Sequence, residues 1–230
     1  MKKIITLAGV VMLLLLFSFV LTSQPAYTVG NKIYPLYSQQ KWGDQYLKER
    51  GCSHTALSIV MSAYGVNYSP LEIHYGDEAL TCSERHSGGS PSDNRSLSVY
   101  SVAKILNAVG IKSHPVYIFN DAEAIEDITS ALKDNRPVIV MCNRKQSKDG
   151  VRLAKSYHFI VLVGIDDHGN VVAINPANGK VNESHCTGSF NITVEQLVKD
   201  HMWSCTDTGY ESFYFNGTEN YGGYVVVEQN

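Results

Sequence analysis

The chain has 230 residues, of which 44% are hydrophobic and 18% are charged, and its net charge is -3. This composition is that of one compact domain with a full-sized core. The chain has no basic run beyond its amino terminus, which argues against a nucleic-acid partner and against binding to an anionic surface.

Residues 1–28 have the layout of an export signal. Lys2 and Lys3 precede an uncharged apolar run from Ile4 to Leu21. The run also just reaches the length of a membrane-spanning helix, and no clear small-x-small cleavage site follows it. We therefore expect a signal peptide or a retained membrane anchor. The remaining domain, residues 33–230, is then secreted or anchored on the outer side of the bacterial cytoplasmic membrane.

The first half of this domain is rich in helix signals. A helix is predicted to start at Cys52, because Ala56 and Ile59 continue a helical spacing of apolar residues. It should end at Gly65, which can adopt the left-handed conformation of a helix cap. Three more helices are predicted in segments that a polar residue opens: SPLE from Ser69, VYSVAKILNAV after Ser98, and DAEAIEDITSALKD after Asn120.

The second half is rich in short β-branched runs bounded by turn residues. Strands are predicted at VYIF, PVIVMC, HFIVLVGI, NVVAIN and YGGYVVVE, and one more helix at TVEQLVKDHMW, capped by Thr193. Helices followed by a mostly antiparallel sheet indicate an α+β fold. The polar stretch from Thr81 to Ser96 is predicted to be a long loop that forms a rim or lid.

Cys52 is a candidate nucleophile because of its place at the amino end of a helix. Backbone N–H groups without helical partners and the positive end of the helix dipole favour a thiolate there. The structural alternative is a small buried packing residue or one half of a disulfide. A partner base would decide between the two.

His158 is the candidate base, because it opens the apolar strand HFIVLVGI. If Asp166 pairs with Gly169 in the following hairpin, His158 lies opposite Ala177. Asn175 is then its diagonal neighbour on the same face, with β-carbons roughly 7–8 Å apart. A shift of one residue would place the two side chains on opposite faces. In this arrangement His158 accepts the thiol proton and Asn175 orients the ring.

Three segments, IYPLYSQQKW, GCSHTALSIVMSAYG and HFIVLVGIDDHGNVVAINPA, together resemble the bacteriocin-leader-processing (double-glycine leader) cysteine peptidases of the papain-like group. Because the chain begins with an export signal, it resembles the free-standing secreted members of this family more than the members that are fused to an exporter. The resemblance runs from about Ile33 to the carboxyl terminus. It implies a papain-like α+β fold and a thiol hydrolase that cleaves peptide or related amide bonds through a thioester. The partner is then a peptide or protein substrate, and no cofactor is implied.

By this resemblance Cys52 matches the nucleophile, His158 the general base and Asn175 the third member of the triad. Gln39 matches the glutamine whose side-chain amide lines the oxyanion hole, and the adjacent Gln40 could take that place instead. Such a donor stabilises the negative charge that acyl transfer builds on the carbonyl oxygen.

Two positions depart from the family pattern. His54 lies two residues after the nucleophile, in CSHT where the family commonly has CGPT, and Asn175 stands where aspartate is more common. A bulky imidazole beside the nucleophile could narrow the pocket or tune the thiol. This departure motivates a second hypothesis, a catalytically degenerate secreted binding module on the same scaffold.

The other four cysteines leave the disulfide pattern open. Cys186 could pair with Cys205 and Cys82 with Cys142, or all could be reduced. A metal site at Cys82 and His86 is disfavoured by the Gly-Gly-Ser-Pro run that follows. No metal site is therefore expected.

Overall fold

The computed structural model describes residues 26–75, 97–142, 153, 158–177, 187–202, 214–215, 218–219 and 222–229. The apolar segment from Ile4 to Leu21, the loop from Thr81 to Ser96, and the cysteines at 82, 186 and 205 lie outside these residues. Within them, no helix has both the length and the apolar character needed to span a membrane.

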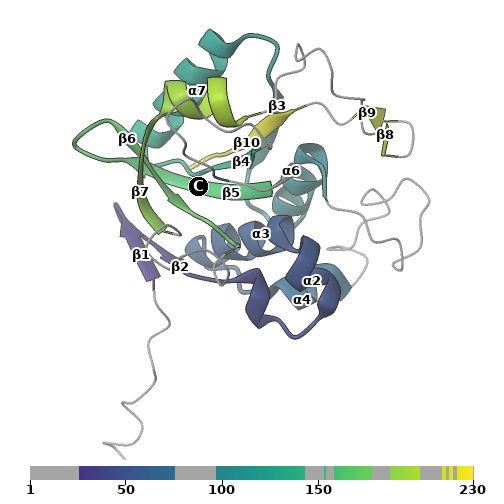
Figure 1. The fold of residues 1–230 in the computed structure, drawn as a ribbon. Coiled ribbons are helices and arrows are strands. Elements are labelled where there is room, and N and C mark those ends of the chain that lie inside the picture. The colour runs from purple at the N-terminus through teal and green to yellow at the C-terminus, as the bar shows by residue number, and fades with distance from the viewer. Residues whose placement is uncertain are drawn as a thin grey trace, which may run out of the picture.

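A six-stranded sheet forms the centre of the fold (Figure 1). All of its strand pairs are antiparallel, so the described part of the chain has the predicted α+β architecture. The order across the sheet is β3 (Ser113–Tyr117), β10 (Gly223–Val227), β4 (Val138–Cys142), β5 (His158–Ile165), β6 (Asn170–Ile174) and β7 (Thr187–Thr193).

Helices cover both faces of this sheet (Figure 1). One face carries α3 (Cys52–Ala63) and α6 (Val99–Ala108), and the other carries α7 (Asp121–Lys133) and α8 (Val194–Gln196). The shorter elements are η1 (Gln39–Lys41), α2 (Gln45–Arg50), α4 (Pro70–Tyr75) and η3 (Leu197–His201), with the strand pairs β1 (Ala26–Val29) with β2 (Lys32–Pro35) and β8 (Tyr214–Phe215) with β9 (Thr218–Glu219).

The predicted caps are present. Gly65 follows α3 with a φ of 79°, and the side chains of Ser98 and Asn120 accept hydrogen bonds from the first turns of α6 and α7. Ser69 and Glu72 exchange hydrogen bonds at the start of α4, and Thr193 and Gln196 form a capping box at α8. These side chains satisfy N–H groups that have no partner inside the helix.

Three expected elements differ in extent. The strand predicted at residues 116–119 is β3, which begins at Ser113 and includes Pro115. Proline is tolerated there because β3 is an edge strand. The helix predicted from Thr193 changes after Gln196 into a π-helical turn, η3. The strand predicted from Tyr221 to Glu228 is confirmed over Gly223–Val227.

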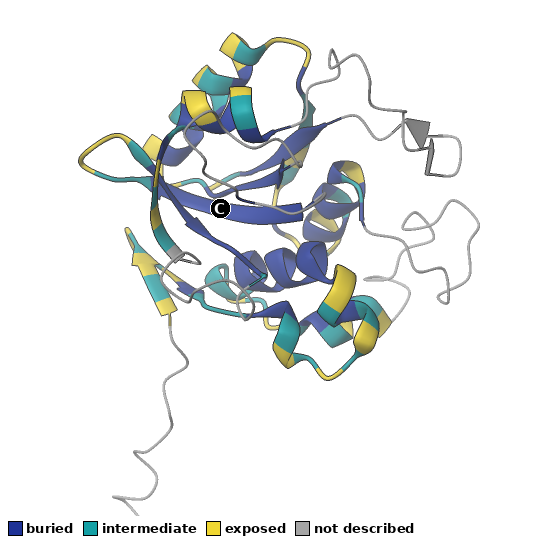
Figure 2. Cartoon of the chain, viewed as in Figure 1, coloured by how far each residue is buried: buried dark blue, intermediate teal, exposed yellow. Residues whose placement is uncertain are grey.

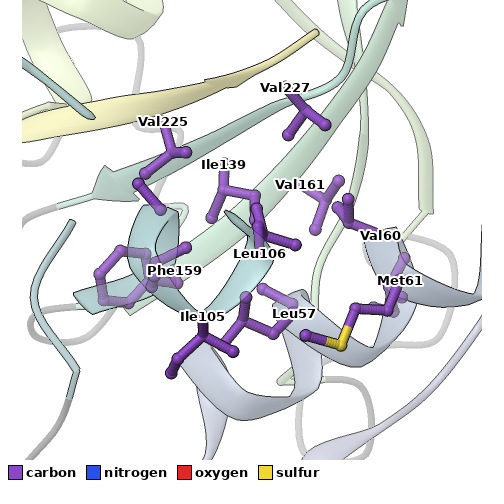
Figure 3. Close-up of a cluster of buried hydrophobic side chains, with 14 of the residues drawn as sticks. Leu57, Val60, Met61, Ile105, Leu106, Ile139, Phe159, Val161, Val225 and Val227 are labelled. Atoms are coloured by element: carbon purple, nitrogen blue, oxygen red, sulfur yellow. The ribbon is translucent and has the colours of Figure 1, made fainter. Parts of the chain in front are cut away.

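The core consists of two layers, one on each face of the sheet (Figure 2). Alternate residues of β5 belong to different layers, so this central strand is buried on both sides. Phe159 and Val161 pack with Leu57 of α3 and Leu106 of α6 (Figure 3). Burial of each such side chain stabilises the fold by about 1.5–3 kcal/mol. The packing fixes α3 against β5, and hence fixes the start of α3 relative to His158.

Candidate active site

The turn before Cys52 requires glycine. A Cβ atom on Gly51 would lie 2.5 Å from the carbonyl oxygen and 2.8 Å from the Cα of Leu47. Without a side chain, the Gly51 N–H donates to that same carbonyl oxygen at 2.9 Å. The chain can therefore leave α2 and enter α3 directly, which places Cys52 on the first turn of α3.

The Cys52 thiol is buried, with 4% of the residue exposed. Burial raises the pKa of the thiol, while hydrogen bonds from the backbone N–H groups of Phe159, Ser53 and Cys52 itself offset part of the increase. The position at a helix terminus predicts a lowered pKa and hence a thiolate. The pKa is instead raised, because removal of the thiol from water outweighs the hydrogen bonds from the backbone N–H groups. Cys52 is thus a neutral thiol at pH 7.

His158 and Asn175 are in direct contact. His158 Nε2 lies 2.7 Å from Asn175 Oδ1, and each residue is 8% exposed. The backbone N–H of Ala177 also donates to Asn175 Oδ1, at 2.9 Å, which identifies this atom as the acceptor oxygen. His158 Nε2 must then carry the proton, so the lone pair of the neutral ring is on Nδ1.

The pKa of His158 is lowered because burial disfavours the charged ring, although the bond to Asn175 offsets part of this decrease. The imidazole is therefore neutral at pH 7 and can accept a proton at Nδ1. A buried, neutral, oriented imidazole is the form that a general base requires.

The pairing register of β5 and β6 brings these two side chains together. It differs from the predicted register by one residue near the turn and agrees with it near His158 and Asn175. Asp166 pairs with Asn170 rather than Gly169, because Gly169 adopts a φ of 82° and adds one residue to the turn. A bulge between Leu162 and Gly164 then leaves Val163 without a partner. This second offset cancels the first, so Val161 pairs with Ile174 as the predicted register requires, and His158 and Asn175 share a face.

Two backbone contacts bring four segments together. The N–H of Phe159, the residue after His158, bonds to the Cys52 thiol. The N–H of Gln39 donates to the carbonyl oxygen of Pro176, the residue after Asn175, at 2.9 Å. The start of α3, the start of β5, the end of β6 and η1 therefore meet at one place. These are the four predicted site positions.

The two candidate oxyanion residues differ in burial. Gln39 is 5% exposed, and Gln40 is half-buried. Both side-chain amides donate to the carbonyl oxygen of Lys48, Gln39 Nε2 at 3.0 Å and Gln40 Nε2 at 2.7 Å. Their common partner is a backbone atom in the last turn of α2, which no sequence motif indicates.

His54 lies on the opposite side of α3 from Cys52. Two residues along an α-helix turn the side chain by about 200°. The His54 ring is buried and packs edge-to-face against Tyr46, with centroids 6.0 Å apart, and against His74 at 5.1 Å. This imidazole therefore belongs to the contact of α3 with α2 and α4. It does not narrow the space beside the thiol, as the sequence suggested it could.

Cys142 is a free and fully buried thiol, so the proposed bridge with Cys82 is not formed. It is the last residue of β4 and lies directly opposite His158 in the sheet. Burial raises its pKa, and electrostatic repulsion from Cys52 raises it further. A second neutral thiol therefore lies beside the candidate base, and the sequence pattern does not predict this pairing.

Among the described residues, no group of three or more His, Cys, Asp or Glu side chains could hold a metal ion. Cys82 and His86 lie outside that part of the chain.

Comparison with known proteins gives a family and two distant structural likenesses. The Peptidase_C39 like family matches residues 32–198. The chain is similar to the peptidase domain of Streptococcus ComA, a bi-functional ABC transporter involved in a quorum sensing pathway. The identity is 13% and the TM-score 0.41, over 79% of this chain and 93% of that one. It is also similar to UfSP from C. elegans, with 12% identity and a TM-score of 0.44, over 91% of this chain and 36% of that one. No curated protein matches it significantly.

Proposed function

Because the chain belongs to the Peptidase_C39 like family, we propose that it is a thiol hydrolase that cleaves peptide or related amide bonds. Cys52 is the nucleophile, His158 the general base and Asn175 the residue that orients the base. Gln39 supplies one donor to the oxyanion, and the backbone N–H of Cys52 supplies the other.

The observation that carries this proposal is the pair of hydrogen bonds at Asn175 Oδ1. Asn175 Oδ1 accepts from both the Ala177 N–H and His158 Nε2. The lone pair of the ring is therefore on Nδ1, and the N–H of the next residue bonds to the Cys52 thiol. A base with its acceptor atom fixed, one residue before a backbone N–H that bonds to a thiol with a raised pKa, suits proton transfer at the moment of attack.

The reaction proceeds in two halves. His158 Nδ1 takes the proton of Cys52 while Sγ bonds to the substrate carbonyl carbon, and the negative charge on the carbonyl oxygen is bound by the two N–H donors. The C–N bond then breaks, and the amine leaves with the proton from His158, which gives a thioester. Water attacks the thioester as His158 takes its proton, and the thiol regains a proton when the acid product leaves.

The substrate is a peptide or protein outside the cytoplasm. The motive is the charged and apolar pattern of residues 1–28, which would export the chain and either be removed or hold it at the membrane. A leader-processing role rests on the sequence resemblance alone. Fractionation of cells that express the full chain tests the location, and protein found in the cytoplasm would refute it.

A second candidate is the degenerate binding module. The raised pKa of Cys52 is the observation in its favour, because an inactive thiol has no need of activation. The position of His54 on the other side of α3 removes the argument that the pocket is blocked. The rate of Cys52 alkylation as a function of pH separates the candidates. An enzyme shows a second inflection from His158, whereas a binding module shows only the inflection of an isolated thiol.

A thiol-reactive peptide warhead tests the enzyme directly. Wild type and the matched control Cys142→Ala should be labelled, whereas Cys52→Ala and Cys52→Ser should not. The control removes the other free thiol that the described residues contain. Undiminished labelling of Cys52→Ala would refute the assignment.

A further inference from the structure

Gln39 and Gln40 share one hydrogen-bond acceptor beside the candidate active site. Gln39 Nε2 donates to Lys48 O at 3.0 Å and Gln40 Nε2 at 2.7 Å. Lys48 lies in the last turn of α2, where backbone carbonyls have no partner inside the helix and carry partial negative charge. A carbonyl oxygen has two lone pairs, so it can accept both bonds at once.

The other end of the Gln39 amide is not satisfied. Gln39 Oε1 is buried and accepts no hydrogen bond from the part of the chain that the structure describes. Exchanging the oxygen and nitrogen of the amide would place an oxygen against the Lys48 carbonyl, so the orientation is fixed by that contact. Buried acceptors without a donor are uncommon and costly. Among the described residues, the side-chain amide of Gln39 therefore has one hydrogen bond, from Nε2 to Lys48 O. This orientation is unfavourable for Oε1, which is left buried without a donor.

The backbone of the same residue is held firmly. The Gln39 N–H donates to Pro176 O at 2.9 Å, next to Asn175. With the backbone held, a change in the direction of the Gln39 amide requires only rotation about the bonds of its side chain and the loss of its hydrogen bond to the Lys48 carbonyl.

We propose that Gln40 is a positioning residue for the oxyanion donor Gln39. When a substrate carbonyl develops negative charge, the Gln39 amide turns its Nε2 from the Lys48 carbonyl to the oxyanion. Gln40 keeps the Lys48 carbonyl bonded, so the turn leaves no helix-end carbonyl without a donor. In the absence of Gln40, Gln39 is the only donor to Lys48 O among the residues that the structure describes, and it is retained there. This inference rests on the proposed thiol chemistry and assigns the two adjacent glutamines different roles.

The inference predicts a selective defect. In Gln40→Leu the affinity for a peptide aldehyde should fall about tenfold, because its hemithioacetal places an oxyanion in the hole and the Lys48 carbonyl loses one hydrogen bond. In Gln39→Leu it should fall roughly a hundredfold. Alkylation of Cys52 by iodoacetamide, which forms no oxyanion, should be unchanged in both variants.

The experiment compares binding of an alanine tripeptide aldehyde with iodoacetamide alkylation for the full chain. Gln40→Lys restores a donor of similar reach and should recover the affinity. Gln45→Leu removes a glutamine of α2 that contacts Glu49 instead, and should match wild type.

An unchanged aldehyde affinity in Gln40→Leu overturns the inference. The inference is also overturned if the aldehyde affinity and the rate of alkylation fall by the same factor in this variant. A larger defect in Gln40→Leu than in Gln39→Leu also overturns it, because the roles are then exchanged. If wild type and Cys52→Ala bind the aldehyde equally, the proposed function itself fails.

Discussion

Asn175 Oδ1 accepts two hydrogen bonds, one from the Ala177 N–H at 2.9 Å and one from His158 Nε2 at 2.7 Å. The first bond fixes the amide, and the fixed amide then determines which nitrogen of His158 carries the proton. A neutral amide performs this task without a charge. Asparagine, at the position where the family resemblance implies aspartate, is thus compatible with an oriented base.

Replacement of Asn175 should separate orientation from charge. Asn175→Ala removes the acceptor of Nε2–H, and kcat should fall roughly 10- to 100-fold. Asn175→Asp keeps an acceptor and adds a negative charge, which raises the pKa of His158. The acid limb of kcat against pH should then move to higher pH. An alanine variant with the activity of wild type would show that the contact has no catalytic role.

The acid stability of the protein should depend on His158. Burial lowers the pKa of His158 in the folded state below its usual value of 6.5. The unfolded chain therefore binds more protons than the folded chain once the pH falls below about 6.5. The free energy of unfolding should decrease from there towards lower pH, and the decrease should be smaller in His158→Gln. Urea titrations at pH 7.5 and pH 5.5 measure this decrease. An equal decrease in wild type and His158→Gln would contradict the lowered pKa of His158.

Local signals predicted most helices correctly. Gly65, Ser98 and Asn120 act as caps in the structure because each satisfies a requirement of its own backbone neighbours. Strand β5 was equally clear, since eight consecutive residues from His158 to Ile165 form a strand buried on both faces. These features depend on interactions within short stretches of chain, so they can be predicted from the sequence alone.

Features that depend on distant contacts were missed. Strand β7 was not predicted, because Gly188 and Asn191 have positive φ values and interrupt its regular pattern. The strand pair β1 and β2 and the short helix α2 were also not predicted. The predicted register at His158 was correct only because the extra residue in the turn and the bulge at Val163 cancel. The pKa of Cys52 is raised because the thiol is buried against β5, and no sequence motif predicts this burial.

Gly51 should be required for its small size. An added Cβ would lie 2.5 Å from the Leu47 carbonyl oxygen, so Gly51→Ala must shift the backbone between α2 and α3. We expect a loss of about 1–3 kcal/mol in the free energy of unfolding, together with slower labelling of Cys52. Gly164→Ala is the matched control, because its Cβ would meet only Val29 Cγ1, at 3.7 Å. Chemical denaturation measures both variants, and equal stability of the two would contradict the steric argument.

His54 should stabilise the fold without contributing to the chemistry. Its ring fills the space between α3 and the stacked pair of Tyr46 and His74, which lie 4.5 Å apart. His54→Ala should therefore lower the free energy of unfolding by roughly 1–3 kcal/mol. The rate of Cys52 alkylation in the folded protein should stay within about twofold of wild type, because the side chain points about 200° away from the thiol. His54→Phe, which keeps an aromatic ring, should recover part of the stability. A change of more than tenfold in alkylation at unchanged stability would instead show that His54 tunes the nucleophile.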